Sequence, residues 1–292
     1  MSMDKLQDKI RKLKNPTMLD LTIIPEHIPV HIYDDTGSIA DAYAQFSEAL
    51  LEALKDTIPA VRFHFNTFAV LGPDGLELLG EVMAKAAQKG YYVLLDAPDN
   101  FSRPSTQNMA QRLLAADAMW PCDALTVPVY IGSDGLQPYA ELLKNCDKAI
   151  FAVLRTANKT APELQDLLTG GRLVHTAAAD MVKRFGEPLL CRCGYSKIGA
   201  VGAANAADSL RNLRSKYKDM FLLVDGYDYS NANAKNCSFA FDKLGHGAVV
   251  CAGKTITAAW LLEDTNGKHY VQQAVEAAER TKKNLLRYVT VL

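Results

Sequence analysis

Eight short runs rich in β-branched and aliphatic residues alternate with helical stretches along this chain. The runs cover 18–22, 60–65, 91–97, 124–130, 149–158, 198–204, 221–227 and 247–253. Most are largely continuous apolar stretches rather than alternating polar and apolar ones, which is typical of parallel strands that are covered on both faces. Eight strands, each followed by a helix, predict an α/β fold of the closed (β/α)8 TIM-barrel type. An open doubly wound sheet is the alternative, but the glycine-rich turn that it needs does not follow the first run.

The stretches between the runs carry helix signals. Ser38 precedes a helical pattern at 39–56, and Pro73 with Asp74 begins another that ends before Gly90. Further helices are predicted at 162–168, 173–186 and 270–289.

The N-terminal segment predicts a short helix outside the barrel. Residues 1–15 are amphipathic, with Leu6, Ile10 and Leu13 on one side. Because the chain has no linker rich in proline, glycine or serine, we expect residues 1–292 to form a single domain.

The overall composition favours a cytoplasmic protein that handles a small ligand or a partner. A formal net charge of -1 and a pI near 6.6 give no electrostatic reason to expect nucleic acid or a membrane as a partner. No apolar run approaches the roughly 20 residues that span a bilayer. Cys191 and Cys193 lack a second closely spaced pair, so no metal site is predicted, and the thiols are expected to be reduced.

Polar residues gather where the second and third predicted strands end. In a TIM barrel the chemistry lies at these carboxyl ends. Arg62, His64 and Asn66 alternate with apolar residues and share one strand face, and Asp96 ends the next strand. An ion pair between Arg62 and Asp96 is expected, either as a structural contact or as part of a site. For His64 alone, a hydrogen-bonded core histidine is the favoured interpretation, and a catalytic acid or base is the alternative.

The ends of the seventh and eighth predicted strands suggest an anion site. Barrels often bind phosphate there through glycine-rich backbone, and Gly226, Gly253 and Lys254 offer amides and a positive charge. Asp225 and Asp228 place negative charge in the same loop and weaken the prediction.

Two segments carry a family resemblance. "DALTVPVYIGSDGLQPY" (123–139) and "AIFAVLRTANKTAPELQDL" (149–167) resemble the longer bacterial orotidine 5′-phosphate decarboxylases. "AVRFHFNTFAVLGPDGLELL", "YYVLLDAPDN" and "FLLVDGYDYSNANAK" followed by "GAVVCAGKTI" come in the order and spacing of that family. The resemblance covers nearly the whole chain. It implies a TIM barrel, a homodimer and cofactor-free decarboxylation of orotidine monophosphate to UMP in pyrimidine biosynthesis.

The resemblance also implies which residues stand at the catalytic positions. The family uses an alternating Lys–Asp–Lys–Asp array, and Asp96 matches its first aspartate. Pro98 stands at the protonating lysine and Phe101 at the second aspartate. Arg62 replaces the lysine that ends the second strand, and Thr22 replaces an aspartate that contacts ribose. Proline has no proton to give, and arginine stays protonated in proteins.

The ligand-binding positions of the family are exchanged in part. Thr126 and Asn158 match family residues, and Lys254 stands at the arginine that holds phosphate. A small phosphorylated, nucleotide-like ligand is therefore a candidate partner.

Three functions remain open. The first is a decarboxylase of altered mechanism, and the second is a non-catalytic member that binds a nucleotide, another ligand or a protein. The third is a different reaction that uses Arg62, His64, Asp96 and Lys254 at the barrel mouth. The loss of proton-transfer groups favours the second.

Overall fold

A closed barrel of parallel strands forms the centre of the computed structural model, which describes residues 1–22, 24–96, 102–262 and 266–292. The strand order around the barrel is β1-β10-β9-β8-β5-β4-β3-β2, and β2 pairs again with β1. The bounds are β1 Thr17–Leu21, β2 Ala60–His64, β3 Tyr92–Asp96, β4 Ala124–Pro128, β5 Ala149–Val153, β8 Ile198–Ala203, β9 Leu222–Asp225 and β10 Ala248–Ala252. All eight predicted strands are present, so the predicted (β/α)8 barrel is confirmed.

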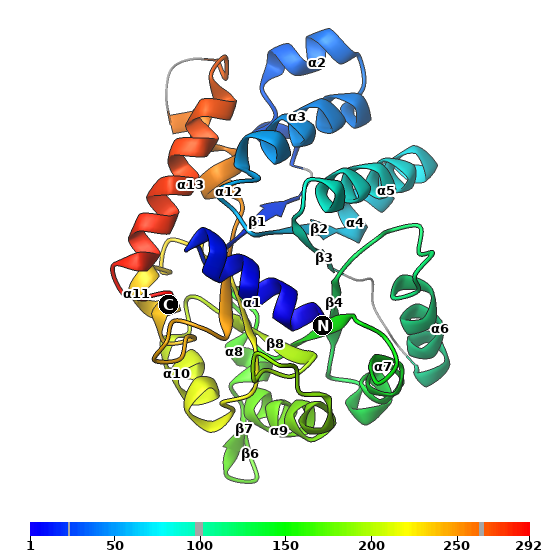
Figure 1. Ribbon diagram of the computed structural model, residues 1–292, viewed down its shortest axis with the longest axis vertical. Coiled ribbons are helices and arrows are strands. Elements are labelled where there is room, and N and C mark those ends of the chain that lie inside the picture. Colours follow the sequence, from blue (N-terminus) through cyan, green and yellow to red (C-terminus); the bar gives the residue numbers. More distant parts are fainter. Residues whose placement is uncertain (23, 97–101, 263–265) are drawn as a thin grey trace.

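Helices surround the barrel (Figure 1). The longer ones are α1 Ser2–Leu13, α3 Ile39–Leu54, α5 Gly72–Gln88, α6 Arg103–Leu113, α9 Val174–Gly186, α10 Ala207–Lys216 and α13 Tyr270–Leu286. The shorter ones are α2 Val30–Thr36, α4 Phe65–Ala69, α7 Gln137–Leu143, α8 Pro162–Gln165, α11 Ala234–Ser238 and α12 Lys254–Thr257.

Two predicted helix boundaries have a clear local cause. The Ser38 side chain accepts a hydrogen bond from the Asp41 amide at 3.1 Å, which satisfies one of the free N–H groups at the start of α3. Gly90 follows α5 with a φ of 88°, a left-handed conformation that glycine adopts without steric cost.

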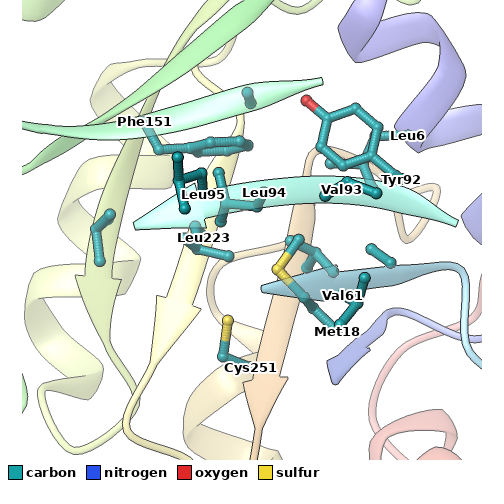
Figure 2. Close-up of a cluster of buried hydrophobic side chains, with 14 of the residues drawn as sticks. Leu6, Met18, Val61, Tyr92, Val93, Leu94, Leu95, Phe151, Leu223 and Cys251 are labelled. Atoms are coloured by element: carbon teal, nitrogen blue, oxygen red, sulfur yellow. The ribbon is translucent and has the colours of Figure 1, made fainter. Parts of the chain in front are cut away.

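Apolar side chains fill the barrel at the amino ends of its strands (Figure 2). Met18 is in register with Cys251, and Phe151 with Gly199. Gly199 leaves room for Phe151, because a Cβ at that position would lie 2.9 Å from the aromatic ring. Alternate residues of a strand point to the same face, so the face that bears Met18 continues with Asp20. The barrel interior therefore changes from apolar to charged along the strand direction.

Helix α1 crosses the amino-terminal end of the barrel (Figure 1). Its Leu6 is fully buried and lies beside Tyr92 (Figure 2). The Ser2 hydroxyl hydrogen-bonds the Tyr92 hydroxyl at 2.9 Å, and Lys5 Nζ donates to Asp123 Oδ1 at 2.7 Å. The predicted N-terminal helix outside the barrel is confirmed, and it covers the end opposite the polar site.

One predicted helix is wrong over part of its length. The segment 162–168 is helical only to Gln165, and β6 Leu168–Thr169 pairs antiparallel with β7 Arg172–Leu173. Glycines at 170 and 171, both with positive φ, form the turn between these strands, and this turn signal was missed. In the described part of the chain, no helix combines the length and the apolar character needed to cross a membrane.

Candidate functional site at the barrel mouth

Five charged side chains meet inside the barrel at the carboxyl ends of the strands. We call Asp20, Arg62, His64, Asp96 and Asp225 the mouth array. Asp20 is in register with Arg62 across β1 and β2, and His64 with Asp96 across β2 and β3. Residues in register point to the same face of a sheet, so strand pairing alone gathers four of the five.

Arg62 is the buried centre of the mouth array. Its Nη2 donates to Asp20 Oδ2, and also to Asp225 Oδ1 at 2.8 Å. Burial disfavours the charged guanidinium, but the carboxylates of Asp20 and Asp225 raise the pKa of Arg62 well above its usual value. Arg62 therefore stays charged and does not exchange a proton.

The predicted ion pair between Arg62 and Asp96 is wrong. The direct partner of Asp96 is His64, whose Nδ1 lies 3.1 Å from Asp96 Oδ2. The partners of Arg62 are Asp20 and Asp225, two strand-end carboxylates that were not predicted to pair with it. Asp225 reaches Arg62 from β9, two strands beyond β1, across the inside of the closed barrel.

His64 bridges two carboxylates. Its Nε2 lies 2.8 Å from Asp20 Oδ1, while its Nδ1 contacts Asp96. Burial by itself lowers the pKa of His64, but the charge of Asp20 and the hydrogen bonds to both carboxylates raise it to about 9. The imidazole is thus a cation at neutral pH, and both ring nitrogens donate.

The two carboxylates beside His64 are held in their charged forms. Burial would raise the pKa of Asp20, but the charges of Arg62 and His64 keep it well below its usual range. The pKa of Asp96 is also lowered, because the hydrogen bond and charge of His64 outweigh burial. Two hydroxyls complete the cluster: Thr22 Oγ1 donates to Asp20 Oδ1 at 2.9 Å, and Thr126 Oγ1 donates to Asp96 Oδ1.

At the predicted anion site the backbone amides already have a partner. Asp228 Oδ2 accepts from the amides of Gly253 at 2.8 Å and Lys254 at 3.1 Å, and Asp228 Oδ1 accepts from Thr255 at 2.8 Å. A carboxylate of the chain itself therefore occupies the position where these three N–H groups converge.

Gly226 has a packing role that sequence reasoning did not reveal. Its φ is 80°, and a Cβ there would lie 2.2 Å from the Cβ of Ala157. The glycine thus lets the loop after β9 approach the loop after β5 closely. A part for Gly226 or Gly253 in holding a ligand stays a prediction.

The loop after β5 bonds mainly to itself. Asn158 Nδ2 donates to Thr160 Oγ1 at 3.0 Å, and Arg155 forms a two-pronged pair with Asp166 at 3.0 Å for both contacts. The structure places Asn158 outside the mouth array, and its part in binding a ligand stays a prediction.

Two positions that the family resemblance singled out, Pro98 and Phe101, lie outside the described residues. Within the described ranges, no group of three His, Cys, Asp or Glu side chains is placed to hold a metal ion.

A barrel of parallel strands with an apolar floor and a charged carboxyl end defines a (β/α)8 barrel protein with its polar site at the mouth. An orotidine 5′-phosphate decarboxylase of Rhodopirellula baltica is 32% identical over 248 residues, which cover 82% of each chain. The chain belongs to the orotidine 5′-phosphate decarboxylase family.

Two further similarities extend over almost the whole chain. An orotidine 5′-phosphate decarboxylase of Clostridium botulinum is 26% identical over 98% of this chain and 99% of its own. The crystal structure of the orotidine 5′-monophosphate decarboxylase of Plasmodium berghei superimposes with a TM-score of 0.77 at 15% identity, covering 97% and 99% of the two chains. At that identity the superposition shows the fold alone. No protein-family profile matches the chain.

Proposed function

We propose that this chain is a divergent member of its family that binds a small ligand at the barrel mouth and does not convert orotidine monophosphate to UMP. The observation that carries the proposal is the state of Arg62, which the family resemblance aligns with a lysine. Arg62 is buried between Asp20 and Asp225 and stays protonated, so it cannot act as an acid or a base. In the sequence, Pro98 aligns with the lysine that protonates the product in the family, and a proline side chain has no proton to donate.

The loop chemistry supports a change of ligand. A phosphate dianion at the amides of residues 253–255 would have to displace the Asp228 carboxylate, which accepts three hydrogen bonds there. The negative charges of the phosphate and the Asp228 carboxylate repel each other. A dianion therefore gains less binding free energy from these amides than it would at a site without Asp228. A nucleotide remains the first ligand to test because of the family, and a ligand without phosphate is the second.

Two measurements test the proposal. The first follows UMP formation from orotidine monophosphate, where we expect no signal above the uncatalysed background. A turnover number of about 1 s⁻¹ or more, typical of enzymes, would reject the proposal. The second measures thermal unfolding with UMP, with phosphorylated sugars and with their unphosphorylated forms. A ligand that binds only the native state at about 100 times its Kd adds about 2.7 kcal/mol of stability, which is seen as a raised midpoint.

His64 favours a second candidate, a reaction with general acid catalysis at the same mouth. An imidazolium with a pKa near 9 between two carboxylates is a proton donor that neither Arg62 nor Pro98 can replace. Replacing His64 with glutamine keeps a hydrogen-bond donor and removes the acidic proton. We expect it to abolish turnover of any substrate found by screening, with the ligand-induced thermal shift retained. Full activity of His64→Gln would exclude this role.

A further inference from the structure

Two adjoining hollows lie on the outside of the barrel along α13. The first, about 500 Å³, lies between α13 and the segment of α12 and residues 258–262. The second, about 490 Å³, lies between α13 and α11. Tyr227 and Asn284 line both hollows, so the two form one continuous surface, which we call the α13 groove. In Figure 1, α12 lies beside the middle of α13 and α11 beside its end.

Positive charge dominates the α13 groove. Lys254 and Arg280 line the first hollow, and Lys235 and Arg287 line the second. All four are exposed, and none has an ion-pair partner in the part of the chain that the structure describes. The formal net charge of the whole chain is -1, so this excess is local and does not reflect a basic protein.

The only acidic residue among the described lining is Asp228, and it is already satisfied. Its two carboxylate oxygens accept from the amides of residues 253–255 at the start of α12. It therefore offsets one of the four positive charges, and an excess remains for a ligand.

Helical spacing places the two arginines at separate points of the groove. Arg280, Asn284 and Arg287 follow an i, i+4, i+7 pattern, which puts them on one face of α13. Seven residues at 1.5 Å rise place the Cα atoms of Arg280 and Arg287 about 10 Å apart along the helix axis. Each guanidinium can bind a phosphate through two parallel hydrogen bonds, and each hollow adds a lysine.

We propose that the α13 groove binds a small molecule with two phosphate groups, one in each hollow. Arg280 and Lys254 hold one phosphate, Arg287 and Lys235 hold the other, and the middle of the ligand lies over Tyr227. The half-buried Tyr227 offers an aromatic surface between the two cationic pairs. The α13 groove shares Lys254 and Asp228 with the predicted anion site but no residue with the mouth array. Because the proposed function rests on Arg62 and Pro98, it can fail while this proposal stands, and the reverse.

Calorimetric titration with fructose 1,6-bisphosphate, fructose 6-phosphate and inorganic phosphate tests the proposal at physiological salt. We expect the bisphosphate to bind at least about tenfold more tightly than either single phosphate, because only the bisphosphate reaches both cation pairs. Equal affinities, or no binding of the bisphosphate, would overturn the proposal.

Three single variants locate the site. Arg280→Gln and Arg287→Gln each remove one guanidinium, and each is expected to weaken bisphosphate binding about tenfold. The matched control is Lys282→Gln, which removes a positive charge from the same helix at a position that lines neither hollow. We expect it to change the affinity by less than about twofold. Equal losses in all three variants would indicate non-specific charge attraction and would also overturn the proposal.

Discussion

The mouth array and the α13 groove both contain arginines, but in opposite states. Arg62 is 5% exposed and bonded to two carboxylates, whereas Arg280 and Arg287 are exposed and unpaired within the described residues. A buried charge must be compensated by the protein, and an exposed one is compensated by water. The same side chain therefore maintains the fold in one region and is free to bind in the other.

The largest expected effect comes from breaking the centre of the mouth array. Arg62→Met removes the cation and leaves Asp20 and Asp225 without it, which should lower the free energy of unfolding by about 3–5 kcal/mol. Urea denaturation measures the loss. The matched control is Lys85→Met, which breaks the exposed pair with Glu48 and should cost about 0–1 kcal/mol. Similar losses of unfolding free energy in the two variants would contradict the view that the buried ion pairs of Arg62 contribute more to stability than an exposed pair does.

The pH dependence of stability should report His64. Its pKa rises from 6.5 to about 9 on folding, so its contribution is fully present below pH 6.5 and is lost as the pH rises through 9. At 1.36 kcal/mol per unit, the loss is about 3 kcal/mol. Urea unfolding at pH 6, 8 and 9.5 measures it. His64→Gln should remove the decline over this range; an unchanged decline in that variant would assign the effect to another group.

A smaller effect on stability is expected at Asp228, in the loop between the mouth array and the α13 groove. Asp228→Asn removes the charge that accepts three amide hydrogen bonds at the start of α12, and should cost about 1 kcal/mol. Asp208→Asn on the first turn of α10 is the control, because that carboxylate is exposed and bonds only the nearby Arg211 in the described structure. Chemical denaturation should show a change within about 0.5 kcal/mol for the control. No difference between the two variants would contradict the capping role of Asp228.

The smallest effect on stability is expected for the exposed arginines of the α13 groove. Arg280→Gln and Arg287→Gln should each change the free energy of unfolding by less than about 0.5 kcal/mol, because neither arginine has an ion-pair partner to lose among the residues that the structure describes. Urea denaturation of both variants beside Arg62→Met checks this in one series. A loss above about 2 kcal/mol in either groove variant would show a structural role for that arginine.

The strands were predictable because their signal is local. Residues 91–95, for example, are apolar at every position, and a strand covered on both faces requires this pattern wherever it lies in the barrel. The start of α3 at Ser38 and the end of α5 before Gly90 were predictable for the same reason, since a cap acts within one turn. The hairpin at 168–173 was missed because its strands are only two residues long.

The site was predictable only in part. Arg62, His64 and Asp96 do lie together, as their places at neighbouring strand ends indicated. Their pairing was not predictable, because a side chain inside a barrel has neighbours on the adjacent strands and also across the interior. Asp225 is 163 positions from Arg62 in the sequence, and only barrel closure brings the two within 2.8 Å.

The sequence by itself determined the barrel, the N-terminal helix and the family, because each rests on periodicity or on similarity along the chain. Only the tertiary structure decided which carboxylates hold Arg62, that Asp228 occupies the amides of residues 253–255, and that α11, α12 and α13 enclose a cationic groove. The physical reason is the range of the forces. Backbone propensity and apolar patterning act between near neighbours, whereas burial and charge compensation depend on every segment that the fold brings into contact.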